Sequence, residues 1–346
     1  KRQGVIGLDD FDSSWGIWGH NLRKVLGANT EKVYATINGK ANDSQLCFSS
    51  GEIFRLIESY ITDNFGEKGK FRFVIAPDDT PYACTCPSCT AIGNTEKNAT
   101  PAVTELILRL SQRFPRHFFF TTSYLTTQQV TDKQLPPNAG VIVSAINFPL
   151  RRIDGKDAKE KAFAGQLEQW KNVTKNIYIW DYINNFDDYL TPMPILKIAR
   201  QRLQFFKQHG ASGIFFNGSG YSYSSFDEMR TFVLSALLIN PELSVDNLTA
   251  SFFNQEYPAA KKWLYDYYTD LENGTQSGKR LGIYASIRES EKAYLTPEKF
   301  IKFYDEMNDF VSNAKGKERK KLHELQTALS YTRMEMGREH SFDAYG

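Results

Sequence analysis

Two adjacent carboxylates, Asp78 and Asp79, are the most direct candidates for acid–base chemistry in this chain. They lie in the stretch from Phe71 to Cys89, whose first residues, FRFVIA, have the apolar and aromatic character of a buried strand. Many barrel enzymes place their acid and base groups on the loops that follow such strands. The alternative is that both aspartates only make turn hydrogen bonds, as Asp often does before Thr-Pro.

Further polar and aromatic residues follow the other predicted strands, and a parallel sheet would bring these positions to one edge. Carboxylates for proton transfer, aromatic rings that stack on sugars and amides that bind hydroxyl groups together favour glycoside chemistry. No phosphate clamp of Arg and Lys is among them. The candidates are Trp18, His20, Asn21, Tyr124, Asn147, Trp180, Asp181, Tyr182, Asn217 and Tyr221.

Several of these residues also have a structural interpretation. Trp18 is more often a core residue than a ligand platform, and His20 alone is more often a hydrogen-bonded structural histidine. Asp181 can cap the turn at Asn184 and Asn185. Their joint position at predicted strand ends is the reason for the functional hypothesis.

Four cysteines, Cys47, Cys84, Cys86 and Cys89, form a second group that could carry chemistry. The spacing C-x-C-x-x-C is uncommon by chance, and the fourth cysteine would complete a tetrahedral Cys₄ zinc site. The alternatives are disulfides, which suit a periplasmic or extracellular protein, and reduced structural thiols. We expect disulfides or reduced thiols in preference to a metal, and we predict no cofactor. In that interpretation the cysteines brace the loop that follows Asp79.

Length and composition allow a large globular protein and argue against several classes of function. The 346 residues suffice for one large α/β domain with an appendage, or for two ordinary domains. The 42 Lys and Arg are balanced by 40 Asp and Glu, and the basic run from Lys315 to Lys321 is typical of a solvated helix face. We therefore predict no nucleic-acid partner. No apolar run approaches the length of a membrane span, and the oligomeric state is left open.

Strands and helices are predicted to alternate from about residue 32 to residue 240, as in a parallel α/β protein. Pro136 and Pro137 make the connection between two of the strands short or non-helical, and Gly210 is expected to close a helix. The strands are expected near residues 32–37, 71–76, 117–122, 141–146, 177–181 and 213–217, and the helices after Ser50 and at 100–113, 159–172 and 194–208.

The strand count bears on the fold class. About six or seven strands are one or two short of the eight of a complete barrel. A (β/α)₈ TIM-type barrel that lacks its first strand or strands accounts for this count, and an open doubly wound sheet is the alternative. The chain begins at KRQGVIGL, without Met or a signal peptide, which suggests a processed or trimmed product.

The pattern changes after Asn240, where helical periodicity continues without strands. Helices are expected at Leu248 to Asn273, Thr296 to Asn313 and Lys317 to Arg338. The sequence therefore predicts two domains, a barrel over residues 1–240 and an α-helical C-terminal domain over residues 241–346.

The order of several motifs resembles glycoside hydrolase family 163, a family of bacterial enzymes long filed as a domain of unknown function. The resemblance spans about residues 15 to 270. Its motifs are WGHNL, VYATINGK, QLCFSSGE, PDD with CTCPSC, TTSYLTTQQ, IYIWDYINNFDDYLTPMP and GASGIFFNGSG. It implies a (β/α)₈ barrel, distantly similar to those of β-hexosaminidases and α-glucuronidases, and retaining endo-β-N-acetylglucosaminidase activity on complex N-glycans. It also implies a periplasmic, extracellular or cell-surface location in a glycan-degrading bacterium.

We therefore predict a glycoside hydrolase that acts on N-acetylglucosamine-containing glycans of the N-glycan type. Asp79 is the predicted general acid, with Asp78 beside it, and Asp181 is the predicted second carboxylate or a group that orients the substrate. Acting carboxyl groups about 5–5.5 Å apart would indicate retention of configuration, and about 6.5–9.5 Å would indicate inversion. Asn217 stands where the resemblance implies a carboxylate or Gln. A non-catalytic glycan-binding relative on the same barrel is therefore the alternative.

Overall fold

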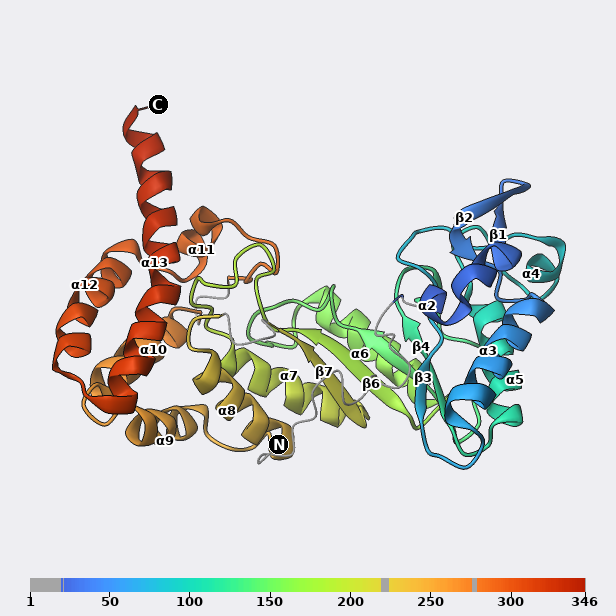
Figure 1. Cartoon of the computed structure of the whole chain (residues 1–346), viewed down its shortest axis with the longest axis horizontal. Coiled ribbons are helices and arrows are strands. Elements are labelled where there is room, and N and C mark those ends of the chain that lie inside the picture. The colour runs from blue at the N-terminus through green and yellow to red at the C-terminus, as the bar shows by residue number, and fades with distance from the viewer. Residues whose placement is uncertain (1–19, 21, 219–223, 276–278, 346) are drawn as a thin grey trace. The chain divides into compact units, whose positions relative to one another are not determined.

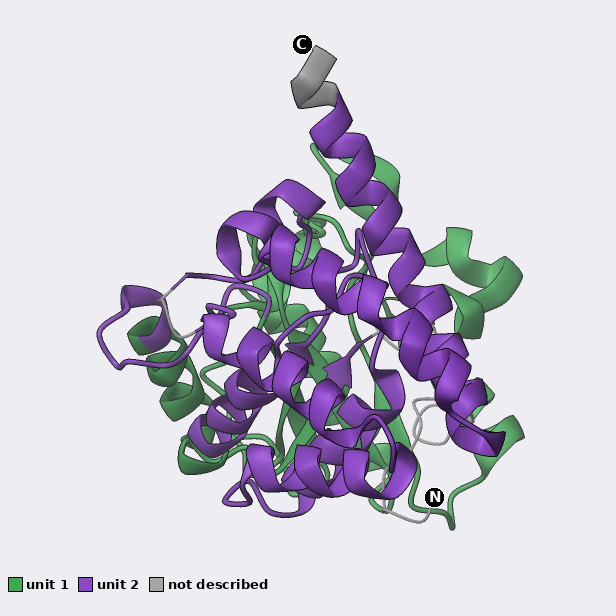
Figure 2. Ribbon diagram, turned by 90° about the vertical axis from the view of Figure 1, so that its left-hand side faces the viewer, with its two compact units in different colours: residues 1–145, 161–180, 207–215 green, residues 146–160, 181–206, 216–346 purple. Residues whose placement is uncertain are grey.

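The structure is a computed structural model that describes residues 20, 22–218, 224–275 and 279–345 (Figure 1). The chain divides into two compact units, coloured separately in Figure 2. Unit 1 comprises residues 1–145, 161–180 and 207–215, and unit 2 comprises residues 146–160, 181–206 and 216–346. The predicted division at residue 240 stays a prediction.

Five strands form the main sheet, in the order of the sequence (Figure 1). They are β3 (Arg72–Val74), β4 (Phe118–Ser123), β5 (Ala139–Ser144), β6 (Ile177–Tyr182) and β7 (Gly213–Asn217), and the pairs from β3 to β6 are parallel. A sheet of consecutive strands matches the wall of a (β/α) barrel, whereas a doubly wound sheet reverses its strand order. The mixed α/β class is confirmed. The described residues contain five parallel-sheet strands rather than eight, so the complete barrel stays a prediction.

The predicted helices before and between these strands lie where the sequence places them. They are α3 (Gly51–Phe65), α5 (Thr100–Arg113), α6 (Ala158–Lys171) and α7 (Leu196–Gln208). The hydroxyl of Ser50 accepts a hydrogen bond from the Glu52 amide and caps α3. Gly210 follows α7 with a φ of 87°, a conformation that glycine adopts without steric cost. The connection from β4 to β5, residues 124–138, is described throughout and contains no α-helix, as the two prolines predict. It carries one short 3₁₀ helix, η2 (Leu125–Thr127).

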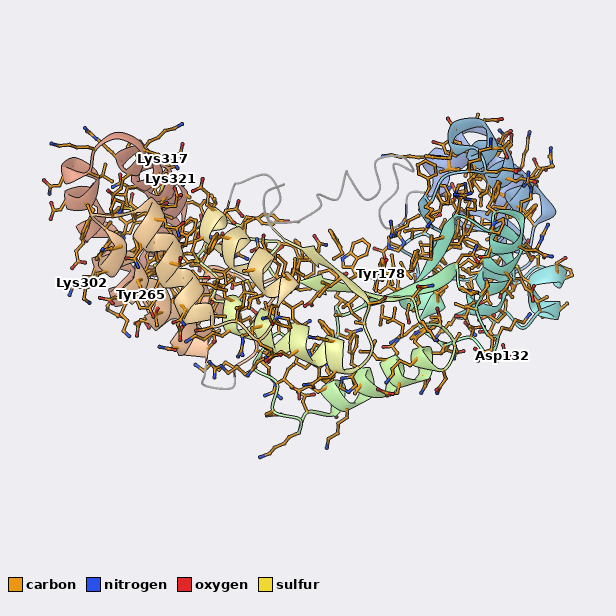
Figure 3. All side chains as sticks on the ribbon, turned by 90° about the horizontal axis from the view of Figure 1, so that it is seen from below. Asp132, Tyr178, Tyr265, Lys302, Lys317 and Lys321 are labelled. Carbon is orange, nitrogen blue, oxygen red and sulfur yellow. The ribbon has the colours of Figure 1, made fainter. Side chains whose placement is uncertain are left out.

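Strands β4 and β5 are buried on both faces, which explains their continuous apolar runs. Phe73 and Phe119 point to one face and pack with the apolar stripes of α3 and α5. The opposite face carries a second cluster made of Val74, Ala76, Phe120 and Ile142, with Phe118, Tyr178 and Trp180 partly buried against it. The ring of Tyr178, labelled in Figure 3, lies 4.8 Å from that of Phe120, centroid to centroid.

Gly140 in β5 is expected to tolerate no side chain. A Cβ atom there would lie 2.4 Å from the Asn176 carbonyl oxygen and 2.7 Å from the Phe120 ring. We expect Gly140→Ala to lower the free energy of unfolding by about 1–3 kcal/mol, because backbone and a buried ring must both shift. Gly165 is the matched control, since a Cβ on this exposed position of α6 meets nothing within 4 Å. Gly165→Ala should be neutral or stabilising by about 0.5–1 kcal/mol in the same urea titration.

The prediction that the strand near residues 32–37 belongs to the parallel sheet is wrong. β1 (Tyr34–Ile37) pairs antiparallel with β2 (Lys40–Leu46) in a separate two-stranded sheet, so it is not a strand of the parallel sheet. Asn38 and Gly39 connect the two strands with φ angles of 52° and 72°. An Asn-Gly pair between two strands is a strong hairpin signal, so the sequence alone could have predicted this hairpin. Before this hairpin lie α2 (Leu22–Leu26) and the 3₁₀ helix η1 (Gly27–Val33).

The segment after residue 240 is helical, as predicted, but its first helix is divided. α9 (Val245–Glu256) and α10 (Lys261–Gly274) replace the single helix expected from Leu248 to Asn273. Pro258 explains the break, because proline lacks an amide hydrogen and disfavours helical backbone at the residue before it. α8 (Asp227–Ile239) precedes this segment, and α11 (Ile287–Ala293), α12 (Pro297–Asn313) and α13 (Gly316–Tyr345) follow α10.

The basic run from Lys315 to Lys321 lies at the start of α13, where Figure 3 labels two of its lysines. The ammonium groups of Lys317 and Lys321 lie 3.0 and 2.7 Å from the Glu256 carboxylate. Part of this positive charge is therefore neutralised within the protein itself. Among the described residues, no helix has both the length and the apolar character that crossing a membrane requires.

Candidate active site

Asp78 and Asp79 lie in unit 1, just beyond the carboxyl end of β3. The Asp78 side chain is 13% exposed, and its Oδ2 atom lies 2.8 Å from Nε and 2.6 Å from Nη2 of Arg23 in α2. Asp79 is exposed, and its carboxylate makes no hydrogen bond or ion pair with any described residue. One carboxylate of the pair is therefore fixed in place, and the other is accessible to a ligand.

Gln45, near the end of β2, holds the backbone of this loop and was not predicted as a site residue. It is 1% exposed. Its side-chain oxygen accepts a hydrogen bond from the Asp78 amide at 3.0 Å, and its side-chain nitrogen donates to the Asp78 carbonyl at 3.2 Å. The same nitrogen lies within hydrogen-bond distance of Thr80 and Tyr82. A buried amide with every bond satisfied positions a loop strongly, because breaking one bond leaves a buried group unpaired.

His20 and Tyr124 lie beside the same strand end. Nδ1 of His20 binds the carbonyl oxygen of Pro77, and the His20 and Tyr124 rings are 5.8 Å apart, centroid to centroid. Because a carbonyl oxygen only accepts hydrogen bonds, Nδ1 of His20 carries a proton and donates it to this bond. Tyr124 directly follows β4, as the sequence predicts.

These residues form one group, which we call the strand-end cluster. Its members are His20, Arg23, Gln45, Asp78, Asp79 and Tyr124. It offers an accessible carboxylate, a second carboxylate held by a guanidinium, an imidazole and an aromatic ring. Such a set can donate a proton and bind a polar ligand with an apolar face. Arg23 and Gln45 were missed because their role depends on contacts with residues 33 or more positions away.

Asp181 lies in unit 2 and its surroundings favour a structural role. Asp181 and Arg202 of α7 are 0% and 1% exposed, and both carboxylate oxygens of Asp181 bind the guanidinium. The Tyr182 amide donates a further hydrogen bond to Oδ1 at 2.8 Å. Nη1 of Arg202 also binds the carbonyl oxygens of Phe148 and Pro149 at 3.3 and 2.8 Å. A carboxylate with both oxygens engaged and no exposed surface is poorly placed to reach a substrate.

The predicted aromatic residues on β6 belong to different units. Trp180, in unit 1, contacts the Phe215 ring edge to face with the centroids 5.0 Å apart. Tyr182, in unit 2, lies edge to face with Phe186 at 5.9 Å. Both are partly buried, so their roles in sugar binding stay predictions.

Two of the predicted amides, Asn147 and Asn217, lie in unit 2. Asn147 is exposed in the turn after β5. Asn217 ends β7, and its carbonyl oxygen accepts a hydrogen bond from the Ile183 amide at 3.0 Å. Trp18, Asn21 and Tyr221 lie outside the described residues.

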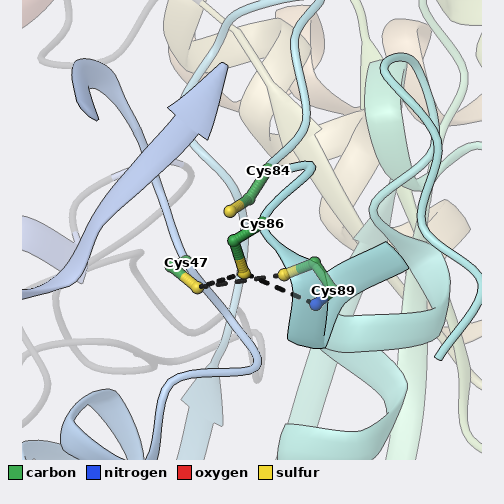
Figure 4. A group of neighbouring side chains, drawn as sticks. All are labelled: Cys47, Cys84, Cys86 and Cys89. Atoms are coloured by element: carbon green, nitrogen blue, oxygen red, sulfur yellow. Dashed lines mark hydrogen bonds between the residues drawn. The ribbon is translucent and has the colours of Figure 1, made fainter. Parts of the chain in front are cut away.

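The four cysteines come together in unit 1 (Figure 4). Their sulfur atoms all lie within 4.8 Å of one another, and all four residues are free thiols. The structure thus shows no disulfide among Cys47, Cys84, Cys86 and Cys89. Hydrogen bonds with neighbouring thiols lower the pKa of Cys84 and raise the pKa of Cys89.

A cavity of about 240 Å³ lies in unit 2, between α10 and the segment that begins α12. Tyr294, Thr296 and Lys299 contribute to its lining. None of the residues predicted for the site lines it. It therefore adds no support to the predicted chemistry.

The sequence and the structure were each compared with those of known proteins. A mutant of the O-GlcNAc hydrolase of Thermobaculum terrenum aligns with this structure at 12% sequence identity and a TM-score of 0.49. The alignment covers 84% of this chain and 64% of that protein, so this chain spans less than two thirds of its length. No curated protein matches the sequence. The model of a domain of unknown function, DUF4838, matches residues 21–270, which is most of the chain. The chain therefore belongs to the DUF4838 family.

Proposed function

We propose that this protein is a glycoside hydrolase acting on N-acetylglucosamine-containing glycans of the N-glycan type. The observation that carries the proposal is the strand-end cluster, in which the accessible Asp79 stands beside a fixed Asp78. The sequential strand order supports a (β/α) barrel, whose active sites lie at the carboxyl ends of the strands. The resemblance of the motifs to glycoside hydrolase family 163 supports the choice of substrate.

A substrate that carries a 2-acetamido group needs no enzymatic nucleophile. Its acetamide oxygen can attack the anomeric carbon, as in the substrate-assisted families. The glycosidic bond then breaks while Asp79 transfers its proton to the leaving oxygen. Water later attacks the anomeric carbon of the cyclic intermediate and returns a proton to Asp79. Two displacements at one carbon retain the configuration.

In this mechanism Asp78 orients the acetamide group instead of donating a proton. Arg23 and Gln45 hold the Asp78 carboxylate and backbone, which such orientation requires. His20 and Tyr124 shape the sugar subsite. Because both acting carboxylates come from one loop, the mechanism does not require Asp181, which binds Arg202.

The location of the protein is also part of the proposal. Complex N-glycans are carried on secreted and surface glycoproteins, so an enzyme that degrades them works outside the cytoplasm. We place the protein in the periplasm, on the cell surface or in the medium of a bacterium. Detection of the protein in fractionated cells of its source would test this.

A glycan-binding protein without activity is the second candidate. Asn217 favours it, because the amide at the end of β7 cannot act as an acid or a nucleophile. Binding would use the same strand-end cluster.

A paired assay separates the two candidates. The full chain is incubated with a glycoprotein carrying complex N-glycans, released oligosaccharides are identified by mass spectrometry, and binding is measured by calorimetry. We expect released glycans that end in a reducing N-acetylglucosamine, with the β configuration retained in the first product seen by NMR. Binding without release would establish the second candidate. The absence of both would contradict the proposed function.

A further inference from the structure

The four cysteines are positioned as a metal site. Cys47 follows β2, and the other three surround α4 (Pro87–Ala91), 37 or more residues later in the chain. Cys86 caps this helix and Cys89 lies within it. Two segments far apart in sequence therefore bring four sulfurs to one point in unit 1 (Figure 4).

Two of the sulfur–sulfur distances match the edge of a tetrahedron around one ion, and all four sulfurs lie within 4.8 Å of one another. Sγ of Cys47 lies 3.7 Å from Sγ of Cys86 and 3.8 Å from Sγ of Cys89. Four thiolates about 2.3 Å from one zinc ion stand about 3.8 Å apart, the edge of the tetrahedron. A disulfide would need about 2.05 Å. A cluster of several irons would hold its cysteines further apart, because the metal–sulfide core lies between them.

The surroundings suit thiolates. The backbone amide of Thr36 donates to Sγ of Cys84 at 3.2 Å, and the amide of Cys89 donates to Sγ of Cys86 at 3.4 Å. The Ser49 hydroxyl lies 3.0 Å from Sγ of Cys89. Such N–H and O–H groups stabilise the negative charge that a tetrathiolate site carries and orient its ligands.

The burial of the ligands indicates a closed, structural site. Cys47, Cys84 and Cys89 are 8%, 2% and 0% exposed, and Cys86 is partly exposed. Four protein ligands leave no open position for water or substrate, which distinguishes structural zinc from catalytic zinc. The partly exposed Cys86 is the route by which an ion can enter.

We infer that Cys47, Cys84, Cys86 and Cys89 bind one structural zinc ion. Tetrahedral sites made of four thiolates bind zinc or iron. We choose zinc because a structural site needs no redox chemistry, and Zn²⁺ has none. The ion would join the end of the β1–β2 hairpin to the loop that carries Asp78 and Asp79. Gln45, two residues before the first ligand, already binds that loop. The inference does not depend on the proposed function.

Metal analysis of the full chain, purified without chelators and without a histidine tag, tests this inference. We expect about one zinc per chain by mass spectrometry of the elements, as a Cys₄ site predicts. Cys84→Ser and Cys89→Ser should each lose most of the zinc. Ser49→Ala is the matched control, because it contacts the sulfurs without being a ligand, and it should keep the zinc.

A second measurement on the unchanged protein covers the case in which the cysteine variants fail to fold. The metal-free chain is reconstituted with Co²⁺ under reducing conditions, and a tetrathiolate site should show strong thiolate-to-cobalt charge-transfer absorption that one equivalent of Zn²⁺ abolishes. In the zinc-bound protein, the four cysteine thiols should react with a thiol reagent only after denaturation in the presence of a chelator. Iron in place of zinc, two disulfides by thiol count, or no metal bound after reconstitution would each overturn the inference.

Discussion

Asp79→Asn is expected to lower the turnover of N-acetylglucosamine glycosides by about 10²- to 10⁴-fold, the range for loss of a general acid. The variant should remain folded, because Asp79 is exposed and binds no described residue. The same change at Asp63, an exposed carboxylate on α3, should leave turnover unaltered. Steady-state kinetics and circular dichroism measure the two properties. An Asp79→Asn variant as active as the parent would remove Asp79 from the mechanism.

The leaving group separates the roles of the two aspartates. A substrate with a nitrophenolate leaving group needs little protonation, so the deficit of Asp79→Asn should shrink on it. Asp78→Asn should lose turnover by a similar factor on both kinds of substrate, because it orients the acetamide and does not protonate the leaving oxygen. If Asp78→Asn showed the leaving-group dependence instead, the two roles would have to be exchanged.

Arg202→Ala is expected to lower the free energy of unfolding by about 3–5 kcal/mol, because it leaves the Asp181 carboxylate buried without its counter-ion. This is a large part of the about 5–15 kcal/mol that stabilises a typical domain. Arg200→Ala provides the control on the same helix, since that side chain is 33% exposed and should cost less than about 0.5 kcal/mol. Urea titrations followed by fluorescence give both values.

A double variant tests whether the pair itself is needed. Asp181→Leu with Arg202→Met should be less destabilised than the sum of the single changes, because no unpaired charge is then buried. An Asp181→Asn variant that folds should keep its turnover per folded molecule. If Asp181→Asn lost turnover without losing stability, Asp181 would have to be counted as a catalytic residue.

Local sequence patterns determined most of the secondary structure. Ser50 before an apolar helical stripe, and Pro101 in the first turn of α5, mark helix starts through interactions within a few residues. The apolar runs of β4 and β5 reflect burial on both faces of a parallel sheet. The same local reasoning could have found the β1–β2 hairpin from Asn38 and Gly39 and the break at Pro258, since both signals act on adjacent residues.

The sequence by itself thus determined the α/β class, the positions of the main strands and helices, and the place of Asp78 and Asp79 at a strand end. Only the tertiary structure decided which polar groups meet. Arg202 neutralises Asp181, Gln45 holds the Asp78 loop, and Cys47 joins three cysteines across 37 or more residues. The physical reason is that backbone propensities act between neighbours in the chain. Charge pairing, buried hydrogen bonds and sulfur clustering depend on distances that the packed core sets.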